Sequence, residues 1–91
     1  PKTVIEAMVY SVPPIVTDTG GSAELVKHRR CGLVVPPGDA EALGRAMHEL
    51  ASDRQRAAEM GMRARTRIEY HFNIRDTITK LIEVYEGVVR A

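Results

Sequence analysis

The fold of this 91-residue chain is decided by residues 14–22, Pro14-Ile15-Val16-Thr17-Asp18-Thr19-Gly20-Gly21-Ser22. The stretch opens with a β-branched, nearly all-apolar run, which is typical of a strand buried on both faces of a sheet. The Gly pair ends that strand, and Ser22 stands where an N-cap belongs, ahead of Leu25 and Val26 on a short helix. The sequence therefore predicts a strand that runs through a tight turn into a helix N-terminus.

A second apolar run, Leu33-Val34-Val35, follows the short helix and is closed by Pro36-Pro37-Gly38. A helix between two strands makes a βαβ-like unit, in which the chain crosses over and the strands lie parallel. Two strands alone do not form a stable sheet, because three or more, or a covering layer, are generally needed. We therefore expect an α/β fold with a short parallel sheet that lacks neighbouring strands.

Helical patterns surround this unit. Apolar residues at helical spacing cover residues 3–10, and Pro13 stops that helix. Further along, Asp39 is the predicted N-cap of one helix, and Asp53 that of another, which we expect to end near Tyr70.

The second of these later helices is expected to bury Met60, Ala64 and Ile68, with Gly61 as a weak point that costs about 1 kcal/mol against Ala. Asn73 and Asp76 resemble a capping box and predict a further, separate helix. One side of that helix carries a long apolar stripe that needs a partner surface: Ile74, Ile78, Leu81, Ile82, Tyr85, Val88 and Val89. The chain thus divides into an α/β unit, residues 1–38, and a helical tail, residues 39–91, within a single incomplete domain.

Composition is that of an ordinary globular protein, with 44% apolar and 27% charged residues and a formal net charge of +1. A nucleic-acid-binding protein needs a clustered basic face, and none is expected here. The tightest basic run, Lys27-His28-Arg29-Arg30, is interpreted as a solvated loop in preference to a phosphate-binding patch. The alternating Arg63, Arg65 and Arg67 are expected to fan around a helix without forming one stripe.

Cys31 is the single cysteine, so an internal disulfide is excluded and a reducing compartment is favoured. No apolar run approaches the roughly 20 residues that span a bilayer, and the N-terminus has no signal-peptide pattern. A start at Pro1 is interpreted as that of an excised piece. We expect a cytoplasmic protein, with peripheral association at the cytoplasmic face of the membrane as the alternative.

Two features suggest a binding site. Asp18-Thr19-Gly20-Gly21-Ser22 leads from a strand into a helix N-terminus, where free amides and the helix dipole suit an anion. Glu6 lies near the start of a mostly apolar helix, and its carboxylate could accept hydrogen bonds from two hydroxyls, such as those of a ribose. Spacing alone leaves plainer interpretations open, since Gly pairs also serve tight turns and an exposed Glu also favours the helix dipole.

Three linked motifs in this order resemble the retaining glycosyltransferases of group 1, the family 4 type. They are residues 1–8, Pro1-Lys2-Thr3-Val4-Ile5-Glu6-Ala7-Met8; residues 13–26, from Pro13-Pro14 through Gly20-Gly21-Ser22 to Val26; and residues 32–39, Gly32-Leu33-Val34-Val35-Pro36-Pro37-Gly38-Asp39. The resemblance covers nearly the whole chain and implies the C-terminal part of a Rossmann-like GT-B domain that binds a nucleotide sugar.

The resemblance also implies roles for single residues. Glu6 matches the second of two family glutamates and would bind the donor ribose, while the first glutamate would lie upstream of Pro1 and so outside this chain. Pro1, Lys2 and Thr3 would lie beside the donor sugar and diphosphate, with amides from Lys2 and Thr3 only, because Pro1 has none within a chain. No catalytic residue is therefore expected within the chain, and no metal or cofactor is required.

Other positions are expected to be structural. Gly20, Gly21 and Glu24 fit the family pattern and are interpreted as turn, capping or packing residues. Ser11 departs from the family, which has Gly there, and this alters a turn. The histidines His28, His48 and His71 match no catalytic position, and Cys31 is expected to be a small buried side chain.

The resemblance implies a parent enzyme that transfers a sugar to a glycan, lipid or small acceptor, with the missing N-terminal part of the same polypeptide as a partner. Two alternatives stay open. One is a non-catalytic nucleotide-sugar-binding or structural module, which the absent first glutamate and the short sheet would favour. The other is a sugar-nucleotide epimerase of the same fold. The motif around Glu6 and the Gly pair favours the transferase over the epimerase.

Overall fold

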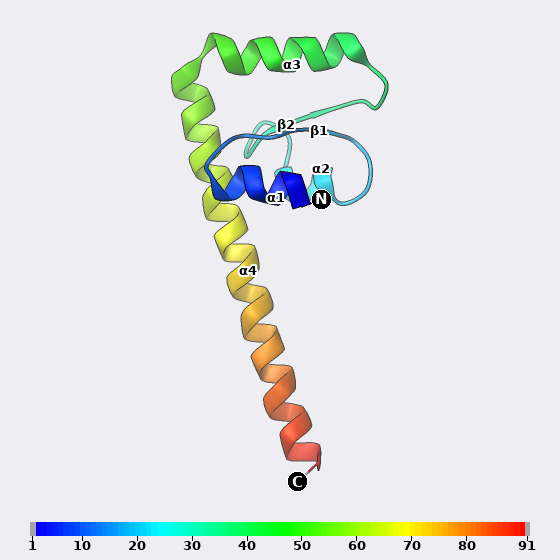
Figure 1. Ribbon diagram of the computed structural model, residues 1–91, viewed down its shortest axis with the longest axis vertical. Coiled ribbons are helices and arrows are strands. Elements are labelled where there is room, and N and C mark those ends of the chain that lie inside the picture. Colours follow the sequence, from blue (N-terminus) through cyan, green and yellow to red (C-terminus); the bar gives the residue numbers. More distant parts are fainter. Residues whose placement is uncertain (1, 91) are drawn as a thin grey trace.

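The computed structural model describes the backbone of residues 2–90 and the side chains of residues 2–88. Pro1 and the side chain of Val89 therefore lie outside the described residues. Figure 1 shows a small α/β unit at one end of a long helix. The elements, in chain order, are α1 Lys2–Val9, β1 Ile15–Thr17, α2 Ser22–Val26, β2 Leu33–Val35, α3 Ala40–Ser52 and α4 Arg54–Arg90.

The two strands form the expected parallel sheet. β1 pairs with β2 in the register Ile15 with Leu33, Val16 with Val34 and Thr17 with Val35, and α2 is the crossover between them. An isolated parallel bridge between His28 and Gly32 extends the approach to β2. Within residues 2–90 the sheet has these two strands, and the predicted short parallel sheet is confirmed.

The sheet has two different sides along the strand direction: one beyond the carboxyl ends of the strands and one beyond their amino ends. β1 and β2 end on the side of the molecule where α1, α2 and α3 begin, because each helix runs back along the strand that precedes or follows it (Figure 1). We call this side the carboxyl edge. α4 passes the opposite side, where the strands begin, and we call that side the amino edge.

The core consists of two small clusters joined by α4. One contains Met8, Cys31, Ala64 and Ile68 and is covered by Val4, Ile5 and Leu25. The other contains Leu33, Val35, Ala46 and Met60 and is covered by Ile15, Ala42 and Leu50. Met60, Ala64 and Ile68 are fully buried at helical spacing, which confirms the predicted inner face and the burial of Cys31.

The turn after α1 explains Ser11. The Ser11 amide donates to the Met8 carbonyl at 3.1 Å and the Val12 amide to the Ala7 carbonyl at 2.9 Å. This pair of bonds is the Schellman motif, which places its first residue beyond the helix in the left-handed region, and Ser11 has φ 61°. A glycine would adopt that conformation without strain, so the departure from the family pattern falls at a position where glycine is favoured.

The interpretation of Gly61 as a weak point was wrong. A Cβ added at Gly61 would lie 1.9 Å from the Ser11 carbonyl oxygen and 3.3 Å from Cδ of Pro13. α4 therefore touches the turn after α1 backbone to backbone, and only glycine allows this approach.

Two predicted caps were also wrong. Gly21, not Ser22, precedes α2 and makes no side-chain cap, because Gly20 already turns the chain at φ 60° and Ser22 is the first helical residue. Asn73 and Asp76 do not start a new helix. Residues 62–86 contain no Gly or Pro, so α4 continues through them, with Asp76 paired to Lys80 at 3.0 Å. By contrast, the predicted caps at Asp39 and Asp53 are confirmed by bonds from the amides of Ala42 and Arg56.

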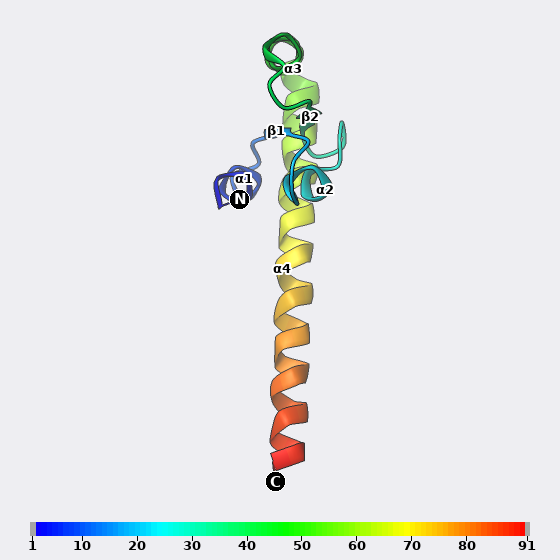
Figure 2. The ribbon, with the colours of Figure 1, turned by 90° about the vertical axis from the view of Figure 1, so that its right-hand side faces the viewer.

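The second half of α4 extends away from the α/β unit without covering it (Figures 1 and 2). Its apolar stripe is exposed to between 41% and 72% at the residues Ile74, Ile78, Leu81, Ile82, Tyr85 and Val88. No part of residues 2–88 covers this stripe.

Gly61→Ala is expected to lower the free energy of unfolding by about 1–3 kcal/mol or more, because the added methyl group must displace the Ser11 turn from α4. Gly44→Ala is the matched control, since a Cβ there meets nothing within 4 Å in α3. That control should gain up to about 1 kcal/mol from helix propensity. Urea unfolding measures both, and equal effects at the two glycines would contradict the backbone contact.

Candidate nucleotide-sugar site

The carboxyl edge brings together the two features that the sequence singled out. Lys2 and Thr3 begin α1, and Glu6 follows one turn later, all three exposed. The turn after β1, residues 18–21, is also exposed. Figure 1 shows α1 and β1 running in opposite directions, so the start of α1 and the end of β1 lie at the same edge. Pro1, the remaining predicted site residue, lies outside the described part of the chain.

Within the described residues α1 starts at Lys2. The amides of Lys2 and Thr3 therefore have no carbonyl one helical turn earlier within this range. The first turn of α1 contains no acidic residue, and the positive end of the helix dipole is therefore not neutralised by its own side chains. A diphosphate placed there would also meet the Lys2 ammonium.

Glu6 lies on the solvent side of α1, away from the buried Met8. Residues four apart share a helix face, so Lys2 and Glu6 stand one above the other. In the described residues Glu6 makes no ion pair, and its two oxygens can both accept hydrogen bonds from hydroxyls. Thr3 lies three residues before Glu6 and borders the same face.

The turn after β1 is held by its own backbone. The Asp18 amide donates to the Val35 carbonyl at 2.9 Å and the Thr19 amide to the Thr17 carbonyl at 2.8 Å. Gly20 needs its positive φ, but a Cβ on Gly20 or Gly21 would meet nothing within 4 Å. Open space thus lies beside the Gly pair, and the turn borders the carboxyl edge without blocking it.

Glu24 lies in the first turn of α2, where its charge favours the helix dipole. Its side chain is exposed, and its backbone carbonyl accepts a hydrogen bond from the Nη2 group of Arg67 at 3.2 Å. The geometry therefore joins Glu24 to α4 through the main chain.

The histidines do not converge. His28 accepts a hydrogen bond at Nδ1 from the Val34 amide at 2.9 Å, which ties the loop before β2 to the strand. His48 and His71 are exposed on α3 and α4. Among the described residues, no three His, Cys, Asp or Glu side chains gather as a metal-binding group. In the same part of the chain, no helix has both the length and the apolar character that a membrane span requires.

The carboxylate of Glu49, which lies outside the carboxyl edge, has a lowered pKa. Arg29 donates from both Nη groups to the two carboxylate oxygens of Glu49, at 2.8 and 3.0 Å. Arg56 Nη2 lies 3.4 Å from Oε2 of the same carboxylate. The hydrogen bond from Arg29 lowers the pKa of Glu49 from its ordinary value of 4.5. Burial opposes this shift, and the positive charges of Arg29 and Arg56 add to it. This cluster fastens the loop before β2 to α3.

The sequence model that describes glycosyl transferases group 1 matches residues 1–67 of the chain. The chain belongs to this family. It is 29% identical over 86 residues to an amylovoran biosynthesis glycosyltransferase of Erwinia amylovora, covering 94% of this chain and 21% of that protein. It is 32% identical over 83 residues to a GDP-mannose-dependent α-(1-6)-phosphatidylinositol monomannoside mannosyltransferase of Mycobacterium tuberculosis, covering 91% and 22%.

A solved structure gives the same answer for the fold. Sucrose-phosphate synthase of Thermosynechococcus elongatus superposes with a TM-score of 0.84 and 31% identity, over 100% of this chain and 23% of that one. The predicted α/β class and GT-B membership are thereby confirmed. The chain spans between a fifth and a quarter of the length of these three relatives.

One group of basic residues was not predicted from the sequence. Arg63 and Arg67 are one turn apart on α4 and share a face with the loop residues Lys27 and Arg30, whereas Arg65 points elsewhere and pairs with Glu69 at 2.7 Å. The three arginines do not form one stripe, as expected, but it was not foreseen from the sequence that Arg63 and Arg67 share a surface with Lys27 and Arg30. Their spacing of four residues was the available signal.

Glu49→Gln is expected to lower the free energy of unfolding at pH 7 by up to about 1 kcal/mol, a modest figure because the pair is partly exposed. A lowered pKa in the folded state stabilises the protein above pH 4.5, and this contribution is lost as the pH falls through the folded-state pKa. The difference from wild type should therefore shrink as the pH falls from 7 to below 4.5 in urea unfolding. Glu41→Gln is the control, since Glu41 is 91% exposed and 3.9 Å from Arg45; a Glu49 effect that does not change with pH would contradict the ion pair.

Proposed function

We propose that this chain is the donor-binding portion of a longer retaining glycosyltransferase, which transfers a sugar from a nucleoside diphosphate to a glycan, lipid or small acceptor. The observation that carries the proposal is the exposed start of α1 at the carboxyl edge, where Lys2, Thr3 and Glu6 share one side. Membership of the group 1 family supports it, and so does the rule that open α/β sheets bind ligands beyond the carboxyl ends of their strands.

Each group has a distinct task in this proposal. The amides of Lys2 and Thr3, with the dipole of α1, hold the diphosphate, and the Lys2 ammonium adds a full positive charge. Glu6 accepts hydrogen bonds from the ribose hydroxyls and so fixes the nucleotide along α1. Pro1 borders the sugar without contributing an amide.

Catalysis by this part of the enzyme is electrostatic. As the bond between the sugar and the diphosphate breaks, negative charge grows on the departing phosphate oxygens, and donors already aimed at them stabilise the transition state more than the bound donor. This set of residues needs no metal or cofactor. The remaining glutamate, which would face the sugar, belongs upstream of Pro1.

We further propose that other parts of the same longer polypeptide cover the exposed stripe of α4 and extend the two-stranded sheet. Those parts would also select the acceptor. The proposed location is the cytoplasm, with peripheral association of the parent at the membrane face as the alternative.

The test uses the full-length parent and measures binding of UDP and GDP sugars by calorimetry. Glu6→Gln should cost about 1–3 kcal/mol of binding free energy for the preferred donor. Glu24→Gln is the matched control, because Glu24 is exposed in the first turn of the neighbouring α2, and it should bind as wild type does.

The ribose role has a sharper readout. Wild type should lose affinity for a nucleotide that lacks the ribose hydroxyls, whereas Glu6→Gln should bind the normal and the deoxygenated nucleotide almost equally. If no nucleotide sugar binds the full-length protein, the enzyme proposal fails. If donor binds but no sugar is transferred to any acceptor or to water, the chain belongs to a binding module.

A further inference from the structure

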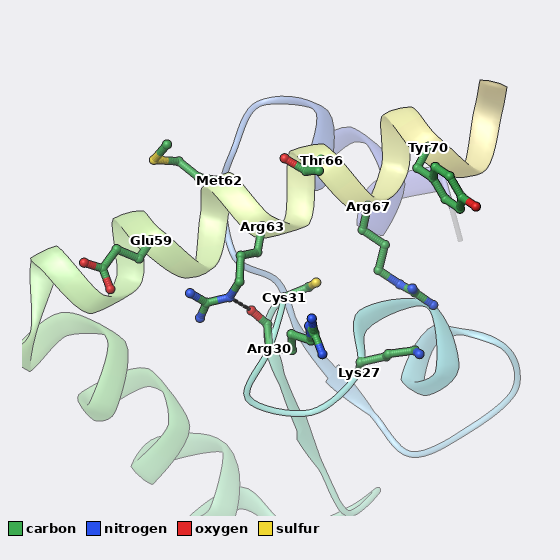
Figure 3. A pocket seen from close by; sticks show the side chains of 9 residues that line it. All are labelled: Lys27, Arg30, Cys31, Glu59, Met62, Arg63, Thr66, Arg67 and Tyr70. Carbon is green, nitrogen blue, oxygen red and sulfur yellow. Dashed lines mark hydrogen bonds between the residues drawn. The ribbon is translucent and has the colours of Figure 1, made fainter. Parts of the chain in front are cut away.

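A recess lies at the amino edge, between the loop after α2 and the face of α4. It is an open groove of about 720 Å³, a size within the range of small-molecule sites. Two basic residues of the loop and two of α4 are among the side chains that line it (Figure 3). We call these four residues, Lys27, Arg30, Arg63 and Arg67, the basic groove.

The charges of the basic groove are not neutralised by the protein. Elsewhere in residues 2–88, five basic side chains form ion pairs with carboxylates, namely Arg29, Arg45, Arg56, Arg65 and Lys80. None of the four groove residues does so within the same residues, and Glu59 is the one acidic side chain that lines the recess. Like charges that line one recess repel one another, so an anion bound among them is favoured.

The two arginines of α4 are held in place before any ligand arrives. Arg63 donates from Nε to the Arg30 carbonyl at 2.7 Å, and Arg67 donates from Nε to the Leu25 carbonyl and from Nη2 to that of Glu24. These bonds fix one edge of each guanidinium group. Both Nη groups of Arg63 are left without a protein partner among the described residues. Binding would therefore cost little additional side-chain entropy.

We propose that the basic groove binds a phosphate group, carried either by a soluble phosphorylated molecule or by a phospholipid headgroup. Guanidinium groups match the geometry of phosphate oxygens, and the ammonium of Lys27 adds a point charge. Tyr70 and Met62 line the rim and are each 66% exposed, so a ligand with an apolar portion beside its phosphate fits. This site lies at the opposite edge from the proposed donor site and does not depend on it.

The first arm of the test is pyrophosphate binding to the full-length parent by calorimetry, with nucleoside diphosphate present to fill the donor site. The variant is Lys27→Gln with Arg30→Gln, whose side chains make no hydrogen bond in the described chain; the Arg30 carbonyl that Arg63 uses is kept. The control is Arg54→Gln with Arg75→Gln, which removes the same charge from α4 outside the groove. The groove variant should lose at least tenfold in affinity, and the control less than twofold.

The second arm replaces pyrophosphate by vesicles of phosphatidylcholine with and without phosphatidylglycerol, and measures cosedimentation of the same proteins. Groove-dependent binding of pyrophosphate assigns a soluble ligand, and groove-dependent binding of the anionic vesicles alone assigns a headgroup. Equal losses in the groove and control variants, or no saturable binding of either probe, would overturn the proposal. The groove variant should still bind the nucleoside diphosphate with wild-type affinity, so failure of the donor site and failure of the basic groove are separate results.

Discussion

The contact between Gly61 of α4 and the Ser11 carbonyl governs how the two halves of the chain meet. Because no side chain stands between the backbones at this point, Met60 and Ala64 reach the two core clusters on either side of the contact. The turn that Gly61 supports ends α1, and α1 in turn carries Lys2 and Glu6 at the carboxyl edge. The position of α4 likewise sets Arg63 against the loop before β2. A packing constraint with no chemistry of its own thus places both candidate sites.

The sequence predicted those parts of the fold that local chemistry determines. The parallel strands followed from two apolar runs around a short helix, and Asp39 and Asp53 capped their helices because each carboxylate could reach an amide three residues on. The failures came from tertiary context. Gly61 has a low helix propensity, but the propensity scale does not include a neighbouring turn that leaves no space for a Cβ. Asn73 and Asp76 matched a cap in type, yet no residue near them interrupts α4.

One candidate site could be predicted from the sequence better than the other, again because only local patterns can be recognised in a sequence. The proposed donor site consists largely of one helix and the turn beside it, so consecutive residues and a family resemblance were enough to name Lys2, Thr3 and Glu6 as candidates. The basic groove joins residues 27–30 to residues more than thirty positions later, and no local pattern connects them. Only the fold shows that they share a surface. The two proposals together place an anion-binding site at each edge of the sheet.

The account depends most on the placement of the nucleotide at the start of α1. The most direct test is a crystal structure of the full-length parent with its nucleoside diphosphate bound. The account predicts density for the diphosphate at the amides of Lys2 and Thr3, with the ribose hydroxyls within hydrogen-bond distance of Glu6. A nucleotide bound away from α1, at the basic groove or elsewhere, would contradict it.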